Sequence, residues 1–239
     1  MKRLLITLCT YNELDNIRLL IPELRLIAPH ADILVIDDNS PDGTGSAVES
    51  MAASDSHVSL LKRPRKLGLG TATVAGFNYG IANGYEQLLN MDADFSHNPA
   101  HIPALLQLAE QNDVVIGSRY VEGGGVAGWG LKRKFMSTTI NIYARILLGL
   151  KTRDNSGSFR CYSVTRLKQV DWNRTLAKGY AFQEEVLYRC RQIGCSFAES
   201  PILFEDRRFG VTKINWVEAV AAVWVILRLG VQRLTGIGR

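Results

Sequence analysis

Residues 87–94 read Gln-Leu-Leu-Asn-Met-Asp-Ala-Asp, an apolar run that ends in two carboxylates one residue apart. The run Gln87–Met91 has the length and composition of a buried strand. Side chains alternate along a strand, so Asp92 and Asp94 are predicted to point to the same side. Such a pair can bind one hard divalent cation, Mg²⁺ or Mn²⁺, that keeps coordination sites for phosphate oxygens. Asp-x-Asp is also common in solvated turns, so the pair needs support from the rest of the chain.

Strand-like and helix-like runs alternate on both sides of this stretch. Short apolar runs predict strands at residues 4–8, 33–36, 58–61, 87–91 and 114–117. Apolar residues at helical spacing predict helices at residues 14–27, 45–53, 71–82, 98–111, 135–150 and 178–192. This alternation is typical of an α/β fold with a doubly wound, mostly parallel sheet. The glycine-rich residues 123–130 break the alternation and are predicted to form a flexible loop, in which Trp129 favours a lid over a site.

Polar residues follow four of the predicted strands. They are Thr10-Tyr11-Asn12-Glu13, Asp37-Asp38-Asn39-Ser40, Asp92-Ala93-Asp94 and Gly117-Ser118-Arg119. Ligands of such sheets bind beyond the carboxyl ends of the strands, so these segments are predicted to converge on one site. Tyr11 can lie along a base or ribose, Glu13 can accept from ribose hydroxyls, and Asp38 can accept from the N–H groups of a base. The repulsion between Asp37 and Asp38 favours a ligand-binding role for that pair, whereas turn and helix-cap roles are the alternative for the asparagines.

Several function classes are disfavoured. The first strand is not followed by Gly-x-Gly-x-x-Gly, which argues against a nicotinamide-dependent oxidoreductase. The 239 residues carry a net charge of +5, which suits phosphorylated ligands or an anionic membrane surface. The basic residues are scattered and accompany no nucleic-acid-binding motif, so no nucleic acid partner is expected. The four cysteines form no Cys-x-x-Cys pair and no signal peptide is evident, which together predict reduced thiols in a cytoplasmic protein.

Read together, these motifs resemble the GT-A glycosyltransferases of family 2, and within them the polyprenyl (dolichyl) phosphate mannosyltransferases. The matches keep their order from residue 10 to about residue 213 and comprise residues 10–13, 36–44, 66–72, 91–97, 117–120, 123–126, 157–160, 179–183 and 206–210. The resemblance implies a GT-A domain over residues 1–213 and a C-terminal helical extension over residues 214–239. It also implies a metal-dependent, inverting transfer of a hexose, mannose from GDP-mannose, onto a polyprenyl phosphate. The processive-synthase signature Gln-x-x-Arg-Trp is absent, which argues against a polysaccharide synthase.

The resemblance assigns roles to individual residues. Asp92 and Asp94 bind the metal and the donor diphosphate, with Ser96 near the third coordination position. The implied catalytic residues are Asp94, Arg119 and Arg207. The implied substrate-binding residues are Tyr11, Glu13, Ile36, Asp38, Asp92, Ala93, Arg133, Ser137, Gln183 and Lys213. His97 is left out, because a single histidine before Asn98-Pro99 is more typical of a helix start.

The predicted acceptor sets the mechanism. A lipid monophosphate has its second pKa at about 6 and is largely ionised at neutral pH, so its attack on the sugar needs no base. The site then has to hold two anionic groups together with a metal and cations. Glu185 is the fallback base if the acceptor is a hydroxyl. Two alternatives stay open: a family-2 transferase with another donor, such as UDP-glucose, or with a hydroxyl acceptor, and an inactive subunit that binds sugar nucleotide or lipid.

The C-terminal residues 216–239 carry a possible membrane element. Their apolar block, residues 219–227, falls far short of the roughly 20 residues that span a bilayer. Trp216 and Trp224 edge this block, and Arg228, Arg233 and Arg239 follow it. The pattern predicts an amphipathic helix in the interface of a membrane, at its cytoplasmic face. A helix packed on the core is the alternative, and residues 135–150 or a separate membrane-anchoring partner would then provide the attachment.

Overall fold

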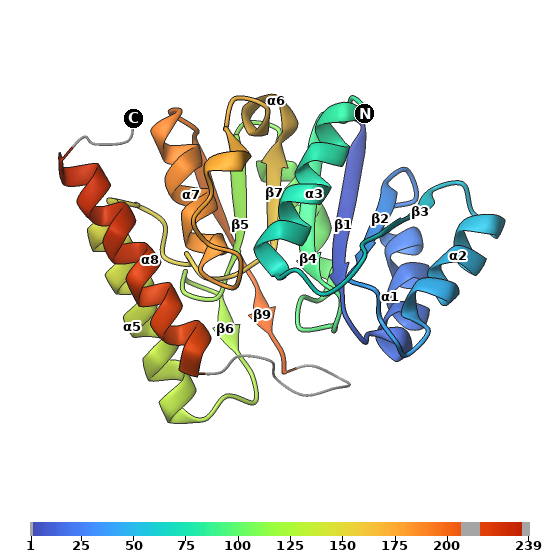
Figure 1. Ribbon diagram of the computed structural model, residues 1–239, viewed down its shortest axis with the longest axis horizontal. Helices are drawn as coiled ribbons and strands as arrows, with labels where there is room; N and C mark the ends of the chain where they lie inside the picture. Colours follow the sequence, from blue (N-terminus) through green and yellow to red (C-terminus); the bar gives the residue numbers. More distant parts are fainter. Residues whose placement is uncertain (1, 207–215, 236–239) are drawn as a thin grey trace.

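The computed structural model describes residues 2–206 and 216–235 of the chain. Its centre is a seven-stranded sheet with the order β3-β2-β1-β4-β7-β5-β8, in which β7 runs antiparallel to β4 and β5 (Figure 1). The strands are β1 Leu4–Thr10, β2 Asp32–Asp37, β3 Val58–Lys62, β4 Gln87–Asp92, β5 Val114–Ser118, β7 Arg160–Ser163 and β8 Phe197–Pro201. The first five agree with the predicted strands to within two residues at either end, which confirms the mostly parallel α/β sheet.

The sequence did not predict β7 or β8. β7 has only four residues, Arg-Cys-Tyr-Ser, which are too few and too polar to show a strand period. Its antiparallel direction matters for the site, because Arg160 pairs with Asn90 of β4 and with Ile116 of β5. The segment that precedes β7 therefore reaches the carboxyl ends of β4 and β5.

Helices cover both faces of the sheet (Figure 1). One core contains residues of α1 (Leu14–Ile27), α2 (Thr44–Ser54) and α4 (Ile102–Leu108). The other core contains residues of α3 (Leu69–Ala82), α5 (Leu131–Leu148), α6 (Val164–Leu167), α7 (Phe182–Gln192) and α8 (Trp216–Thr235). Short 3₁₀ turns lie at η1 (Pro99–His101) and η2 (Trp172–Arg174). Alternation along β1 supplies both cores, with Leu5 in one and Ile6 in the other.

Some predicted elements need correction. The glycine-rich residues 123–130 are more than a loop, because Gly125–Val126 form β6, which pairs in parallel with β9, Leu203–Phe204. A strand of two residues carries no periodic signal, so its partner 78 residues later could not be inferred. The helix predicted at residues 135–150 begins earlier, at Leu131, and the helix predicted from residue 178 begins later, at Phe182.

The C-terminal extension packs on the rest of the chain. Ala222, Ile226 and Leu229 of α8 are buried in the core that α3 and α7 also line. Arg233 donates to the carbonyl oxygens of Ile146 (3.2 Å) and Leu147 (3.0 Å) and so holds the end of α5. The expected boundary between residues 213 and 214, the side chain of Trp216 and Arg239 lie outside the described part. In residues 2–206 and 216–235 the helices are too short or too polar to cross a bilayer.

Candidate active site

The loops after β1 and β2 are tied together at the carboxyl edge of the sheet. The Thr10 hydroxyl donates to Asp37 (2.8 Å), and the backbone N–H of Asn12 donates to the Ser40 hydroxyl (2.9 Å). Ser40 donates its own N–H and hydroxyl to Asp37, at 2.9 and 2.5 Å. The buried Asp37 carboxylate is therefore used inside the protein, and of the predicted carboxylate pair only Asp38 is left for a ligand.

Backbone strain collects at the same edge. The non-glycine residues with positive φ in the described ranges are Asn12 (59°), Asn39 (58°) and Phe95 (64°). They follow β1, β2 and β4, respectively. Asparagine tolerates this left-handed conformation, whereas a bulky side chain adopts it at a cost. Strain of this kind concentrates at ligand sites and supports the predicted location of the site.

Asp38 faces the segment that leads into α3. Its carboxylate lies 2.9 Å from a guanidinium nitrogen of Arg63 and accepts the backbone N–H of Leu67 at 3.1 Å. The next residue back, Lys66, places its Nζ 4.4 Å from the centroid of the Tyr11 ring. The structure thus brings two predicted nucleoside-binding residues, Tyr11 and Asp38, against one basic segment.

The end of β4 carries the predicted metal pair. The Asp92 side chain is 37% exposed and accepts a hydrogen bond from the Ser158 hydroxyl at 2.7 Å. Asp94 is buried and accepts from the N–H and the hydroxyl of Ser96, at 3.1 and 2.6 Å. Ser96 therefore lies beside the pair, as expected, with its hydroxyl proton directed at Asp94. The backbone N–H of Asp92 donates to Nδ1 of His97 at 3.0 Å.

His97 packs under the turn formed by residues 92–97 and holds it through contacts with two aromatic rings. Its ring is stacked on Phe159, with centroids 5.0 Å apart, and meets the Phe204 ring edge-on at 5.4 Å. Burial lowers the pKa of His97, and the neutral ring fits the acceptor role of its Nδ1. Asn98, not His97, caps the following turn by accepting from the N–H of Ala100 at 2.9 Å. Sequence spacing gave no sign that His97 would contact Asp92.

The pair fits a hard divalent cation that a substrate helps to bind. Among the described residues the Asp92 side chain accepts from the Ser158 hydroxyl and lies 3.9 Å from the neutral His97 ring, and Arg119, which also acts on it electrostatically, forms its ion pair with Asp154. Groups of three or more His, Cys, Asp or Glu side chains suited to a complete metal cage are absent from the described residues. Mg²⁺ and Mn²⁺ commonly bind through one or two carboxylates together with substrate phosphates.

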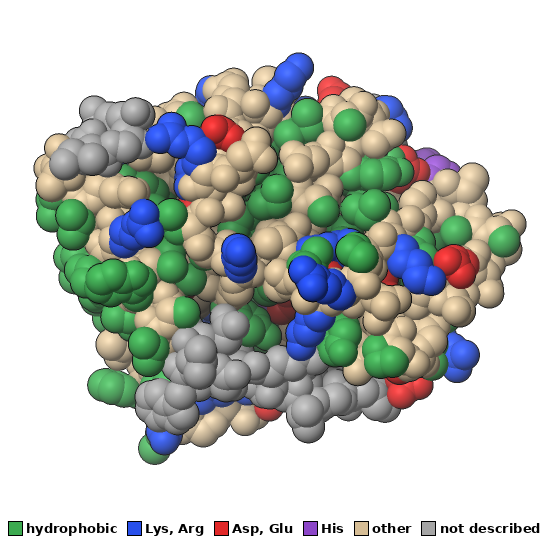
Figure 2. All heavy atoms as spheres, viewed as in Figure 1, with side chains coloured by type: hydrophobic (Ala, Val, Ile, Leu, Met, Phe, Trp, Pro, Cys, Tyr) green, Lys and Arg blue, Asp and Glu red, His purple; other side chains and the backbone are tan. Residues whose placement is uncertain are grey.

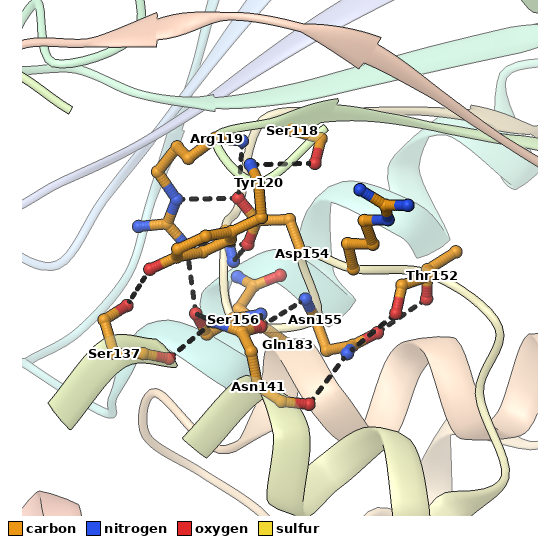
Figure 3. Close-up of polar contacts among 12 residues, drawn as sticks. Ser118, Arg119, Tyr120, Ser137, Asn141, Thr152, Asp154, Asn155, Ser156 and Gln183 are labelled. Atoms are coloured by element: carbon orange, nitrogen blue, oxygen red, sulfur yellow. Dashed lines mark hydrogen bonds and ion pairs between the residues drawn. The ribbon is translucent and has the colours of Figure 1, made fainter. Parts of the chain in front are cut away.

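Arg119 anchors the segment before β7 at the end of β5 (Figure 3). Its Nε and one terminal nitrogen donate to the two oxygens of Asp154 at 2.7 and 2.6 Å, and its backbone N–H donates to Asp154 at 3.0 Å. The same terminal nitrogen donates to Ser156 at 2.9 Å. Burial alone would raise the pKa of Asp154, but the Arg119 guanidinium holds it below its usual range. Contact between Arg119 and a donor phosphate stays a prediction, because its described partners are internal.

The same network fixes α5 to the site (Figure 3). Asn141 donates to the Ser156 hydroxyl at 3.1 Å and accepts from the N–H of Asn155 at 2.6 Å. The Tyr120 hydroxyl donates to the predicted substrate residue Ser137 at 2.7 Å. The first half of α5 is thereby held against the loops that follow β5.

Trp129 lies between two of the predicted phosphate-binding cations. The guanidinium carbon of Arg133 is 4.1 Å from the centroid of its ring and that of Arg119 is 5.5 Å away. Arg133 also pairs with Asp206 at 3.2 Å, where both side chains are partly exposed. The ring of Phe204 in β9 meets Trp129 edge-on at 5.3 Å, so β9 holds the glycine-rich segment against the site.

The start of α7 contains three consecutive buried polar residues, Gln183, Glu184 and Glu185. The side-chain amide of Gln183 has no hydrogen-bond partner within the described residues, which suits its predicted contact with a substrate. Burial raises the pKa of Glu184 to about 7. Glu185 accepts from the N–H groups of Leu176 (2.9 Å) and Ala177 (2.8 Å) and from Arg189 (2.6 Å). Its side chain is buried and its oxygens are occupied by these internal donors, so the structure argues against contact between Glu185 and an acceptor hydroxyl.

The remaining predicted residues divide into three groups. Glu13 accepts from Asn16 at 2.7 Å at the start of α1. Ile36 and Ala93 are buried in the two cores, and their burial speaks against side-chain contact with a substrate. Contact between a substrate and the backbone of either residue stays a prediction. Arg207 and Lys213 lie outside the described residues, so their roles remain predictions.

A doubly wound sheet with a carboxylate pair at one strand end and cations around it defines a nucleotide-sugar transferase of the GT-A class. The chain belongs to glycosyl transferase family 2, whose family model matches residues 5–170. The chain is therefore a glycosyltransferase, and the family resemblance of its motifs is confirmed.

Two relatives are similar over almost the whole chain. The undecaprenyl-phosphate mannosyltransferase of Micrococcus luteus is 40% identical over 228 residues, which cover 95% of this chain and 94% of the relative. The polyprenol monophosphomannose synthase of Mycolicibacterium smegmatis is 38% identical over 233 residues, 97% of this chain and 88% of the relative. The similarity confirms that the chain resembles polyprenyl phosphate mannosyltransferases.

Solved structures confirm the fold. The glucosyl-3-phosphoglycerate synthase of Mycobacterium tuberculosis, in complex with Mn²⁺, uridine diphosphate and phosphoglyceric acid, superposes with a TM-score of 0.69 at 16% identity, covering 96% of this chain and 78% of that one. The mannosyl-3-phosphoglycerate synthase of Rubrobacter xylanophilus gives a TM-score of 0.68 at 18% identity, covering 100% and 75%. At these identities the likeness establishes the fold alone.

Proposed function

We propose that this protein transfers mannose from GDP-mannose to a polyprenyl phosphate, with Mg²⁺ or Mn²⁺ bound by Asp92 and Asp94. The observation that carries the proposal is the near full-length similarity to two enzymes named for undecaprenyl-phosphate mannosyl transfer and polyprenol monophosphomannose synthesis. The partly exposed Asp92 carboxylate beside Asp94 supports it, because a nucleoside diphosphate leaving group needs a cation to balance its charge.

The reaction is a single displacement. An oxygen of the acceptor phosphate bonds to the anomeric carbon, the bond from that carbon to the donor diphosphate breaks, and the configuration inverts. The acceptor phosphate is ionised at neutral pH, so no side chain has to remove a proton. This agrees with Glu185, whose carboxylate is occupied by internal donors. A bound divalent cation would stabilise the charge on the departing diphosphate.

The chain's own residues then bind and orient the two substrates. Tyr11 and Asp38 contact the nucleoside, and Arg133 with Ser137 faces the acceptor phosphate from the start of α5. Arg207 and Lys213 complete the cationic side of the site. Holding two anions at reacting distance is the main contribution of such a site, and fixed cations supply it. Because the acceptor is a membrane lipid, the protein acts as a peripheral enzyme at a membrane surface.

A donor and acceptor screen tests this function. Purified protein is incubated with GDP-mannose or UDP-glucose and with decaprenyl, undecaprenyl or dolichyl phosphate or a soluble sugar acceptor, in Mg²⁺, Mn²⁺ or a chelator, and products are identified by mass spectrometry. We expect prenyl-phosphate mannose from GDP-mannose, and none in the chelator. Efficient transfer from UDP-glucose, or to a sugar hydroxyl in place of prenyl phosphate, would overturn the proposal.

A further inference from the structure

Helix α8 is apolar on two opposite sides. Ala222, Ile226 and Leu229 face the core. The other side is between 40% and 76% exposed at six large apolar residues, which are Val220, Val223, Trp224, Leu227, Val231 and Leu234. Their spacing of three and four residues places them in one stripe. Packing inside the protein explains the first side and leaves the second unexplained.

Helix α5 exposes a second stripe beside the first. Leu131, Phe135, Ile142 and Ile146 are between 45% and 86% exposed and share one face of the helix. The two stripes adjoin where the Tyr143 hydroxyl of α5 donates to the carbonyl oxygen of Val223 at 3.4 Å. Figure 2 shows hydrophobic side chains gathered along the flank formed by these helices. We call the ten residues of the two stripes the α5–α8 flank.

The charge of the flank selects among possible partners. The sequence of α5 contains Lys132, Arg133, Lys134 and Arg145 and no acidic residue. Arg228 adds an exposed cation on α8. Pairing with a second copy of the chain would bring these like charges together, whereas an anionic surface would balance them. An apolar stripe edged by cations is the composition of a helix that lies in a membrane interface.

The flank and the candidate site share helix α5. Arg133 and Ser137, the residues proposed to face the acceptor phosphate, are offset by two residues from Leu131 and Phe135, so at about 3.6 residues per turn they project from the opposite side of the helix. The hydrogen bond between Asn141 and Ser156 fixes that side of α5 to the segment before β7. A membrane under the exposed stripe would therefore lie about one helix diameter, roughly 10 Å, from the site at which a lipid phosphate has to react.

We propose that the α5–α8 flank is the face that docks the protein on an anionic lipid bilayer, with both helices along the membrane surface. This inference rests on the proposed function, which requires an acceptor held in a membrane. It extends the expectation from the sequence in that α5 contributes a stripe of its own. It also corrects that expectation, because Arg233 is engaged by α5 carbonyls and does not trail toward head groups.

Vesicle co-sedimentation of the full chain tests the docking surface. Vesicles contain phosphatidylcholine alone or phosphatidylcholine with phosphatidylglycerol. Two double variants remove one stripe each: Trp224→Ser with Leu227→Ser on α8, and Phe135→Ser with Ile146→Ser on α5. The matched control is Leu26→Ser on α1, which is 83% exposed and lies away from the flank.

We expect wild-type protein to bind the anionic vesicles, and added salt to weaken binding. Each double variant should bind at least about tenfold more weakly, because each loses buried apolar area, and Leu26→Ser should bind like wild type. Equal binding of wild type and both double variants would overturn the proposal. So would a wild-type dimer that ignores vesicles and becomes monomeric in the variants, since a second copy would then cover the flank.

Transfer to prenyl phosphate in detergent separates this inference from the proposed function. The double variants should retain transfer in detergent and lose it with acceptor embedded in vesicles. If wild type binds anionic vesicles through the flank yet makes no product in either medium, the docking surface stands and the proposed function fails.

Discussion

β2 and β4 each end in an aspartate that is followed within two residues by a second one, at the same edge of the sheet, yet the charges of the two pairs are balanced differently. After β2, Asp37 is enclosed by hydroxyl and N–H donors, and Asp38 is paired with Arg63. After β4, Asp92 keeps 37% of its side chain exposed and receives one neutral hydrogen bond from Ser158. The charges of the first pair are stabilised within the protein, which leaves Asp38 to accept hydrogen bonds from a neutral ligand group, whereas Asp92 is left to be completed by a cation.

The sequence of a carboxylate motif therefore does not determine whether its charges are used inside the protein or by a ligand. Both motifs come at the end of a buried parallel strand, and both look functional in sequence. What separates them is the set of donors delivered by other segments, such as Arg63 before α3 and Ser158 before β7. The sharpest tests of the comparison therefore exchange or remove carboxylates in the two kinds of environment.

The largest expected effect comes from the carboxylate pair at the end of β4, Asp92 and Asp94. Asp94→Ala should reduce kcat/KM for mannosyl transfer about a thousandfold or more, because it removes half of the proposed cation site. The variant also removes the acceptor of the Ser96 N–H and hydroxyl, so the free energy of unfolding should fall by about 1–3 kcal/mol, and activity is compared at a temperature at which both proteins are folded. Mn²⁺ binding measured by electron paramagnetic resonance should be lost in parallel.

The matched control is Asp37→Asn at the end of β2, where the carboxylate is enclosed by donors from the protein itself. It weakens hydrogen bonds to Ser40 and Thr10, so it should lower the free energy of unfolding by about 2 kcal/mol and leave Mn²⁺ affinity unchanged. If the two variants lost Mn²⁺ binding equally, the proposed difference between the carboxylates at the ends of β4 and β2 would be wrong.

The second effect concerns the buried ion pair between Arg119 and Asp154 at the end of β5. Arg119→Ala leaves the fully buried Asp154 without its cation, which should cost about 3–5 kcal/mol in the free energy of unfolding, measured in urea. Arg119→Lys should not restore it, because lysine cannot form the bidentate contact. In the control Arg133→Ala, both partners of the lost pair are 34% and 49% exposed, and the cost should stay below about 1 kcal/mol. Equal costs would refute a structural role for Arg119.

Much of the fold could be predicted because its signals are local. The first five strands are short apolar runs bounded by polar residues, and α1 has the predicted bounds Leu14–Ile27. The candidate site at the carboxyl edge followed from the order of strands and helices. The proximity of Ser96 to Asp94 could also be predicted, because the two residues are neighbours in one turn, whereas metal binding by Asp92 and Asp94 stays a prediction.

What escaped prediction depends on contacts between distant segments. Ser158 reaches Asp92 only because β7 is antiparallel, and a strand of four residues cannot be read from periodicity. Asp154, the partner of Arg119, lies 35 residues further along the chain, a separation that periodicity does not bridge. The sequence offered residues 135–150 as an alternative attachment but could not decide whether their apolar side is exposed, since an amphipathic pattern does not state whether that side meets a core or a membrane.

The third test compares two neighbours in α7: a buried oxygen of Glu184 has no hydrogen-bond partner among the described residues, whereas Glu185 accepts from several donors. The pKa of Glu184 is about 7 in the folded state, above the ordinary value near 4.5. Burial favours the protonated carboxyl over the charged one. Protonated Glu184 therefore contributes stability that is complete below about pH 4.5 and is lost as the pH rises through about 7. Glu184→Gln removes the dependence and should be more stable than wild type by up to about 3 kcal/mol at pH 8.

Urea unfolding from pH 4.5 to pH 8 measures this difference, with Glu185→Gln as the control. That control removes the charge on which Arg189 and two backbone N–H groups depend, so it should be less stable than wild type at pH 8. A stability gap between Glu184→Gln and wild type that did not widen with pH would show that Glu184 titrates normally.

The smallest effect should come from the hydroxyl that positions the Asp92 carboxylate. Ser158→Ala removes the 2.7 Å hydrogen bond to Asp92 and leaves both proposed metal ligands in place. The Asp92 carboxylate can then rotate more freely, so Mn²⁺ should bind on the order of tenfold more weakly. Ser158→Thr keeps the hydroxyl and should recover most of the affinity if the methyl group fits. Saturating Mn²⁺ should restore turnover in Ser158→Ala but not in Asp94→Ala, because the first variant lacks only orientation and the second lacks a ligand. Unchanged Mn²⁺ affinity in Ser158→Ala would mean that the backbone of the β4 loop, held by His97, orients Asp92 without help from β7.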